Sequence, residues 1–205
     1  MYRINDIFSS LQGEGHNTGR AATFVRFAGC NLRCSFCDTD FSEYSEMTAG
    51  EIVDAVAKHP ARFVVLTGGE PSLQTDDTLV NALHEAGFTI AMETNGTRRC
   101  PEGIDWVTVS PKKMLHETGN LDDMEKYEDA LRRANEIKIV FDGEHDPEDF
   151  LPSSFNTPTP LLYLQPCDTG DTNRNKEILS KCIAYIMSHP KWRLSLQTHK
   201  LANFK

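Results

Sequence analysis

Three cysteines stand close together in the stretch CNLRCSFC at residues 30–37, directly after the apolar run 24–27. This spacing lets three thiolates converge from one loop onto one inorganic centre. Tetrahedral zinc sites usually take four ligands from two paired motifs, and no second C-x-x-C pair follows in the sequence. Cuboidal iron–sulfur clusters are ordinarily held by four cysteines, so three suit a cluster whose last iron is left for another ligand. A zinc knob and unrelated buried thiols are the alternatives.

Length and composition predict one soluble domain that acts on a small molecule. The 205 residues include no apolar run near the length of a membrane span, and the first residues lack the apolar segment of a secretory signal. The net charge of −9 argues against a surface that follows nucleic-acid phosphates. Six unevenly spaced cysteines fit a reducing cytoplasm, and we interpret Cys100, Cys167 and Cys182 as ordinary residues.

Predicted strands and helices alternate along the chain. We expect strands at 24–27, 62–66, 88–92, 106–109, 137–141, 161–164 and 193–196, and helices at 47–59, 76–86, 122–134 and 176–187. Thr48 and Glu51 form a capping box at the first helix. Strands joined by helices pair in parallel with right-handed crossovers. There are too few units for a closed eight-fold barrel. We therefore expect an α/β fold, an incomplete TIM-like barrel with about six parallel strands and a reduced helix set.

Polar motifs follow the predicted strands, where ligands bind in parallel α/β folds. They are TGGEP at 67–71, ETNG at 93–96, SPK at 110–112 and QPCD at 165–168. Paired glycines let the backbone approach a ligand closely, and the glutamate after them can accept from an ammonium. ETNG is either a tight turn or a ribose contact. Lys138 lies inside a predicted strand, where a buried lysine needs a partner.

A second glycine-rich motif, LQGEG, occupies residues 11–15 ahead of the cysteines. Two glycines around a glutamate suit recognition of a ring that carries amide and amine groups. The alternative is a solvated turn. Thr39, two residues after Cys37, is either a metal ligand or the cap of a turn.

The cysteine loop resembles that of the radical S-adenosylmethionine (SAM) enzymes, with an aromatic residue before the last cysteine. The resemblance implies a [4Fe–4S] cluster on Cys30, Cys34 and Cys37, whose free iron binds SAM and whose reduced form cleaves it to a radical. It implies a partial barrel of parallel strands. The implied SAM contacts are Phe36, Cys37, Asp38, Gly69, Glu70, Ser110, Pro111, Lys112, Gln165, Pro166 and Asp168.

Within that superfamily, LQGEG, RFAGCNLRC-x-x-CDT and QTHK at 197–200 together resemble the 7-carboxy-7-deazaguanine synthase family, over nearly the whole chain. The resemblance implies conversion of 6-carboxy-5,6,7,8-tetrahydropterin to 7-carboxy-7-deazaguanine with loss of ammonia, in the pathway to queuosine and other deazapurines. It implies that Thr39 helps to hold a magnesium ion. The implied substrate contacts are Leu11, Gln12, Gly13, Glu14, Arg26, Thr67 and His199.

The same resemblance implies a cytoplasmic homodimer that receives electrons from a flavodoxin- or ferredoxin-type donor and contacts neither nucleic acid nor membrane. We expect one domain over 1–205, with a substrate segment at 1–23, a core at 24–197 and a tail at 198–205. Two other functions stay open. A glycyl-radical activase has the same cluster loop but would lack LQGEG and QTHK, and a non-catalytic metal-binding module would not cleave SAM.

Overall fold

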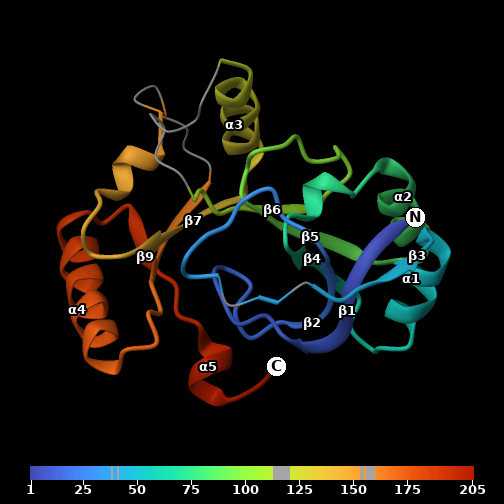
Figure 1. Cartoon of the computed structure of the whole chain (residues 1–205), viewed down its shortest axis with the longest axis horizontal. Helices are drawn as coiled ribbons and strands as arrows, with labels where there is room; N and C mark the ends of the chain where they lie inside the picture. Colours follow the sequence, from blue (N-terminus) through green and yellow to red (C-terminus); the bar gives the residue numbers. More distant parts are fainter. Residues whose placement is uncertain (38, 41, 113–120, 153–154, 156–159) are drawn as a thin grey trace.

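The computed structural model describes residues 1–37, 39–40, 42–112, 121–152, 155 and 160–205. The described residues form one sheet with helices around it (Figure 1). The strands are β1 Tyr2–Leu11, β2 Ala21–Phe27, β3 Ser45–Met47, β4 Phe63–Gly68, β5 Thr89–Thr94, β6 Trp106–Val109, β7 Glu136–Phe141, β8 Leu161–Pro166 and β9 Trp192–Leu194. The helices are α1 Ala49–Ala57, α2 Asp77–Glu85, α3 Leu121–Arg133, α4 Thr172–Ser188 and α5 Thr198–Ala202, with 3₁₀ turns η1 Pro71–Leu73 and η3 Pro147–Phe150.

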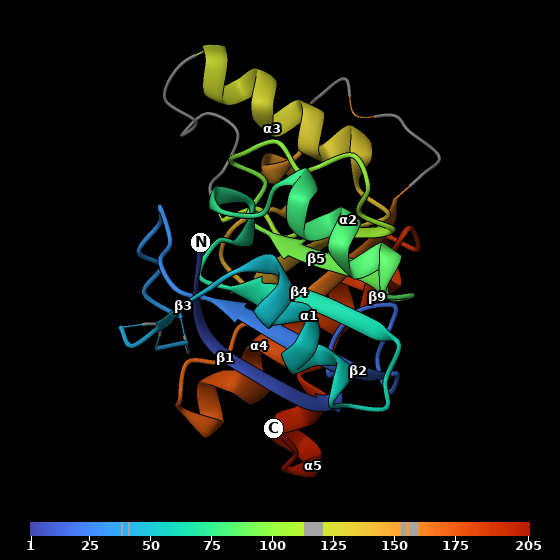
Figure 2. The same cartoon turned by 90° about the vertical axis from the view of Figure 1, so that its right-hand side faces the viewer.

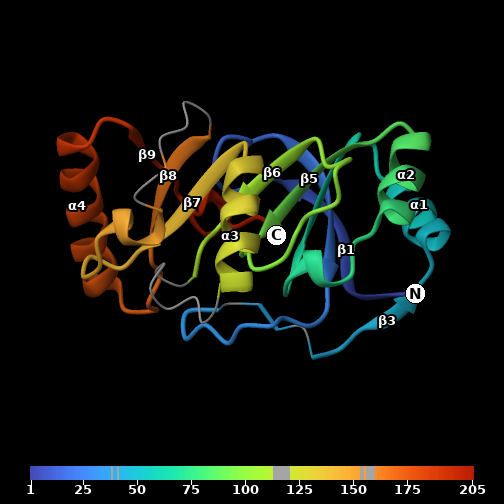
Figure 3. The same ribbon diagram turned by 90° about the horizontal axis from the view of Figure 1, so that it is seen from above.

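The nine strands run in the order β3-β1-β2-β4-β5-β6-β7-β8-β9. From β2 to β9 each neighbouring pair is parallel, whereas β1 pairs antiparallel with both β2 and β3. This confirms the expected open, incomplete barrel, with seven parallel strands where the sequence predicted about six. Helices α1 to α4 lie around the outside of the curved sheet (Figures 2 and 3).

Three elements were not predicted: β1, β3 and α5. Strand β1 carries several polar residues, and its pairing register with β2 shifts between Ile4 and Asp6. A bulge of this kind breaks the two-residue alternation by which a strand is recognised in a sequence. The residues from Tyr2 to Leu11, which the sequence placed in a substrate segment, therefore form an edge region of the sheet.

The outer face of the sheet packs under amphipathic helices. Ile52 and Val56 of α1 and Leu79 and Leu83 of α2 are fully buried in the main apolar core. The capping box that begins α1 is present as predicted, with Thr48 and Glu51 each bonded to the other's backbone N–H. None of the helices within the described residues is long and apolar enough to cross a membrane.

Side chains on the inner face of the barrel sort into layers because alternate residues of each strand point inward. An apolar floor crosses four adjacent strands in register, at Phe24, Val65, Ala91 and Trp106. Two residues further along each strand the paired inward positions turn polar, at Arg26 with Thr67 and at Glu93 with Thr108. The carboxyl ends of the parallel strands therefore surround a polar layer that lies above an apolar one.

The β1–β2 connection and the end of the chain lie across the open side of the barrel, where α5 lies beside the β1–β2 hairpin (Figure 1). The Gly15 N–H donates to Ser195 Oγ at 3.0 Å, and the His16 N–H donates to Glu136 Oε2 at 2.8 Å. The Thr198 N–H donates to the Gly13 carbonyl at 3.0 Å. Segments nearly two hundred residues apart in the sequence thus meet at one seam.

Gly15 tests how much this seam stabilises the fold. Its φ is 64°, and a Cβ added there would clash with the Glu136 carboxylate. Gly19, with a φ of 84°, has no heavy atom within 4 Å of the corresponding Cβ. We expect Gly19→Ala to cost about 1 kcal/mol of unfolding free energy, from backbone strain alone. Gly15→Ala should cost about 2 kcal/mol more, because Glu136 must also move.

The measurement is anaerobic urea denaturation of both variants followed by circular dichroism. Equal losses in the two variants would mean that the contact between Gly15 and Glu136 does not support the fold.

Candidate active site

A cavity of about 680 Å³ lies at the carboxyl ends of the parallel strands. Its lining combines the cysteine loop, the motifs at the strand ends, the LQGEG segment and the QTHK segment. Of the site residues that the sequence predicted, all line this cavity except two. Pro111 lines a neighbouring cavity of about 220 Å³, which also contacts Phe36 and Lys112. Asp38 lies outside the described residues.

The cysteine loop lies directly on the glycine turn that ends β4. The Gly69 N–H donates to the Phe27 carbonyl and the Glu70 N–H to the Gly29 carbonyl, each at 2.9 Å. A Cβ at Gly69 would clash with the Gly29 carbonyl oxygen, so only glycine allows the two loops to approach this closely. The glycine turn therefore fixes the position of the cysteine loop relative to the end of β4.

The three thiols of that loop face the same cavity. Burial raises the pKa of the Cys30 and Cys34 thiols, and in Cys34 it outweighs the opposing effect of the Lys112 ammonium. Among the described residues, no three His, Cys, Asp or Glu side chains are grouped closely enough to hold one metal ion. A four-iron cluster takes each thiolate at a different iron, so three soft donors spread along one loop fit that cofactor.

Glu70 is 1 % exposed and its carboxylate is satisfied within the protein. Its Oε1 accepts from Thr94 Oγ1 at 2.6 Å and from the Ser72 N–H at 3.0 Å, while Oε2 accepts from the Asn95 N–H at 2.7 Å. The side chain thereby ties the end of β5 to the glycine turn. A contact between Glu70 and a ligand ammonium stays a prediction, and so does the ribose contact of the motif around Asn95.

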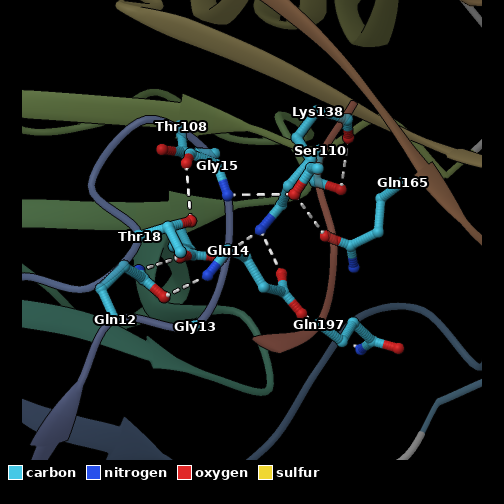
Figure 4. A network of polar contacts seen from close by, with 12 residues as sticks. Gln12, Gly13, Glu14, Gly15, Thr18, Thr108, Ser110, Lys138, Gln165 and Gln197 are labelled. Carbon is cyan, nitrogen blue, oxygen red and sulfur yellow. Dashed lines mark hydrogen bonds and ion pairs between the residues drawn. The ribbon is translucent and has the colours of Figure 1, made fainter. Parts of the chain in front are cut away.

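A buried ionic group forms another part of the cavity wall, and Figure 4 shows Lys138 beside Glu14 within it. The Lys138 ammonium, on β7, forms an ion pair with Glu14 and a second one, at 3.0 Å, with Glu93 on β5. Lys138 thus has the partners that its buried position requires. Burial opposes the charge of Glu14, but Lys138 and the Gln197 amide outweigh it and lower the pKa of this carboxyl to about 2. Burial disfavours the charged Lys138 as well, yet its carboxylate partners raise its pKa.

Two amides complete this group. Gln12 Nε2 donates to Glu93 Oε1 at 2.7 Å, and Gln197 Nε2 donates to Glu14 Oε1 at 3.1 Å. Each carboxylate oxygen has two lone pairs, so both carboxylates keep acceptor capacity toward the cavity. The wall is therefore built to accept hydrogen bonds from a ligand that carries several N–H donors.

Cationic groups lie on other sides of the cavity. The Arg26 guanidinium is 5.2 Å from the centre of the Phe8 ring, and the Lys205 ammonium is 4.4 Å from it. Lys112 Nζ donates to Ser110 Oγ at 2.7 Å, and burial followed by repulsion from Lys138 lowers its pKa. These groups suit the carboxylate ends of ligands.

Two residues of α5, His199 and Lys200, contact other parts of the cavity lining. His199 stands so close to Gly13 that a Cβ at position 13 would clash with its ring. Lys200 Nζ pairs with Asp168 at 2.8 Å, and this hydrogen bond is the first cause of the lowered pKa of Asp168. Ser195 Oγ donates to Gln165 Oε1 at 2.9 Å, which positions this amide near the end of β8.

Three residues of the buried ionic group and its amides were missing from the predicted site: Glu93, Lys138 and Gln197. Lys138 carried a signal, because a lysine inside an apolar strand implies a buried partner. Glu93 and Gln197 lie in motifs that the sequence singled out, but nothing in those motifs shows which way the side chains point. Their partners are distant in the sequence: Glu93 pairs with Lys138 of β7, and Gln197 donates to Glu14 of the β1–β2 connection.

Glu136 lies deeper in the barrel and is 2 % exposed. Burial raises the pKa of its carboxyl to about 7, while the His16 N–H and the Lys138 charge act in the opposite direction. The carboxyl therefore changes charge in the neutral pH range while it holds the β1–β2 connection.

The site combines a three-cysteine loop, a glycine turn packed on it and a cavity at the ends of parallel strands. Comparison with known families gives the same class: the model of the radical SAM superfamily matches residues 24–143, and the chain belongs to this superfamily. The structure is also similar to that of SuiB from Streptococcus suis, with a TM-score of 0.50, 15 % identity and 82 % of this chain and 47 % of that chain covered. This likeness concerns the fold alone.

Within the superfamily, the chain belongs to the 7-carboxy-7-deazaguanine synthase family. It is 46 % identical to the 7-carboxy-7-deazaguanine synthase of Bacteroides thetaiotaomicron, over 100 % of both chains. It is 40 % identical to that of Bordetella pertussis, over 97 % of each. The crystal structure of QueE from Escherichia coli has a TM-score of 0.72 and 30 % identity, covering 95 % of this chain and 93 % of that chain.

The raised pKa of Glu136 predicts a pH dependence of stability. The folded chain holds this proton up to about pH 7, whereas the unfolded chain releases it near its ordinary value of 4.5. Between these values the folded state binds more protons, so this group lowers the unfolding free energy as the pH rises. Glu136→Gln should remove this pH-dependent loss. Its unfolding free energy should therefore exceed that of wild type by an amount that grows to about 1–2 kcal/mol between about pH 5 and about pH 8.

Urea titrations of both proteins across this range measure the difference. Glu102→Gln, at an exposed position, is the matched control and should follow wild type. Parallel profiles for Glu136→Gln and wild type would show that Glu136 does not titrate in this window.

Proposed function

We propose that this chain converts 6-carboxy-5,6,7,8-tetrahydropterin into 7-carboxy-7-deazaguanine and ammonia as a radical SAM enzyme. One observation carries the proposal. One cavity joins a three-cysteine loop to a wall of lysine-paired carboxylates and amides that suits an aminopyrimidinone ring. The synthase names of full-length relatives support it. Substrate and products balance without a net oxidant or reductant, since the two ring systems differ by one ammonia.

On the cofactor side, Cys30, Cys34 and Cys37 would hold the [4Fe–4S] cluster. When bound, the cluster and SAM supply the radical that begins the reaction. The glycine turn at Gly68 and Gly69 leaves room for backbone to approach the amino acid part of SAM. The remaining contacts proposed for SAM are Phe36, Asp38, Glu70, Ser110, Pro111, Lys112, Gln165, Pro166 and Asp168.

On the substrate side, the Glu14 carboxylate would accept hydrogen bonds from the ring N–H and the exocyclic amine of the pterin. Because its pKa is lowered to about 2, Glu14 stays an acceptor throughout the neutral range. The Arg26 guanidinium would bind the substrate carboxylate through its two-pronged geometry. The other contacts proposed for the substrate are Leu11, Gln12, Gly13, Thr67 and His199.

Further features belong to the same proposal. Cys37 is exposed, which favours approach of a flavodoxin- or ferredoxin-type electron donor to the loop. We propose a homodimer in the cytoplasm, where free thiols such as those of this chain stay reduced. We treat 1–205 as one catalytic domain with a substrate segment at 1–23, a core at 24–197 and a tail at 198–205. Neither nucleic acid nor membrane is a partner in this proposal.

We also propose that Thr39, which lines the cavity, binds a magnesium ion. A neutral hydroxyl is one ligand of the six that magnesium prefers, so substrate oxygens and water would supply the others. The ion would then bind well only when the pterin is present, and it would help to orient that substrate.

Anaerobic turnover of the carboxylated tetrahydropterin with SAM and a reductant tests the proposed function. We expect 7-carboxy-7-deazaguanine and ammonia in equal amounts from wild type. Cys34→Ala should lose iron and product together, because one of three cluster ligands is missing. Cys182 lies on the buried face of α4 and does not line the cavity, so Cys182→Ala is the matched control and should keep its iron.

Release of iron from Cys182→Ala would contradict the ligand assignment. SAM cleavage without consumption of the pterin would overturn the assignment of the pterin as substrate and favour the glycyl-radical activase. A brown protein that does not cleave SAM after reduction would favour the metal-binding module.

The magnesium proposal predicts that Thr39→Ala keeps its iron content but loses most of its response to added magnesium. In this proposal the Thr39 hydroxyl is the only ligand that the described side chains give to the ion, and the substitution removes it. Anaerobic calorimetry of magnesium binding, with and without pterin, measures the loss directly. Thr89→Ala, at an exposed position at the start of β5, is the control. Unchanged binding of magnesium to Thr39→Ala would place the ion elsewhere.

A further inference from the structure

The carboxylates of Glu14 and Glu93 meet at one ammonium although they come from distant segments. Glu14 belongs to the β1–β2 connection and Glu93 to β5, and both pair with Lys138 of β7. Their side chains are 16 % and 22 % exposed, whereas that of Lys138 is 4 % exposed. The lysine is therefore more deeply buried than the two carboxylates, and all three residues line the cavity.

Without the Lys138 ammonium, the carboxylates of Glu14 and Glu93 would not both stay ionised. Two carboxylates that share a site repel each other, and one of them then takes up a proton. A protonated carboxyl donates a hydrogen bond and loses acceptor capacity. Such a change would oppose binding of a ring edge made of N–H donors.

Three further titratable residues lie close enough to affect the protonation of the group formed by Glu14, Glu93 and Lys138. They are Glu136 on β7, Lys112 after β6 and His199 on α5. Glu136 has already taken up a proton below about pH 7. Lys112 hydrogen-bonds to Ser110 rather than to either carboxylate in the part of the chain described.

We propose that Lys138 is a positioning residue for the substrate, which keeps Glu14 and Glu93 ionised side by side as a double acceptor for the N–H donors of the pterin ring. The assignment rests on the proposed function for the identity of the ligand. Two carboxylates over one ammonium leave one excess negative charge at the cavity wall, which favours a donor-rich ring over one that presents acceptors. Lys138 acts through its partners and need not touch the substrate.

Lys138→Met tests the proposal, because methionine keeps the length of the side chain and removes its charge. The variant is made in a Glu136→Gln background, since Glu136 would otherwise titrate in the same range. Anaerobic calorimetry with the cluster-loaded protein measures pterin affinity at about pH 6 and about pH 8.5. Relative to the background protein, we expect Lys138→Met to lose at least about tenfold more affinity at the lower pH, as one pKa unit implies.

Lys138→Arg should restore the weak pH dependence of the background, because it returns a charge to the same place. Lys191→Met removes a surface lysine that pairs with Glu148 at 2.9 Å, and it should leave pterin binding unchanged. Equal loss of affinity by Lys138→Met at both pH values would indicate a purely structural role and overturn the proposal. Unchanged affinity would overturn it as well.

A measurement without ligand separates this inference from the proposed function. Difference infrared spectroscopy detects the carbonyl stretch of a protonated carboxyl group. Between about pH 8.5 and about pH 6 we expect this band to appear in Lys138→Met and not in the background protein or in Lys138→Arg. Adding Glu14→Gln should remove it, because a lone carboxylate has no anionic neighbour in the pair.

Absence of the band from a folded Lys138→Met variant overturns the proposal whatever the ligand is. Failure of the background protein to bind pterin would count against the proposed function, and the infrared result would still decide the role of Lys138. If Lys138→Met does not fold, Lys138→Gln replaces it with the same expectations.

Discussion

The contact of Lys138 with Glu14 and Glu93 is the interaction on which the architecture of the cavity depends. It joins the β1–β2 connection to two strands of the barrel around a lysine side chain that is only 4 % exposed. Burying such charges carries a desolvation cost that their mutual attraction only roughly offsets, so apolar residues would serve stability as well or better. Charges at this depth therefore indicate a role in binding, and their partner amides show how fully the protein satisfies them.

The open barrel explains why that role falls to segments outside the parallel strands. An incomplete barrel leaves one side without a strand, and the polar groups there need partners. The β1–β2 connection supplies one through the His16 N–H, which donates to Glu136 of β7, and it is joined to the residues around α5 by hydrogen bonds to Ser195 Oγ and from the Thr198 N–H. The same two segments carry Glu14 and Gln197, so closure of the seam and assembly of the substrate wall are one structural event.

Much of this structure could be predicted from the sequence. The alternation of strands and helices gave the partial barrel, and the capping box at Thr48 marked the start of α1 within a residue. The motifs after the strands could be placed at one cavity because parallel strands share a carboxyl edge. Strand β1 escaped prediction because its bulge interrupts the alternation of buried residues.

The orientation of individual polar side chains was the second limit. Glu93 belongs to a motif that could equally have been a turn, and its pairing with Lys138 depends on the register of β5, β6 and β7. Glu70 shows the same limit. Its motif predicts a ligand contact, which stays a prediction, but does not indicate that the carboxylate accepts hydrogen bonds from Thr94, Ser72 and Asn95 within the protein. Pairings across strands are properties of the folded sheet rather than of any short motif.

The division of the cavity suggests how one fold supports different substrates. The cofactor side depends on backbone proximity, namely the glycine turn of β4 packed on the cysteine loop. The substrate side depends on side chains from the β1–β2 connection, the inner faces of β5 and β7 and the segment before α5. Because the two sides share few residues, the second can change its charge pattern without moving the first.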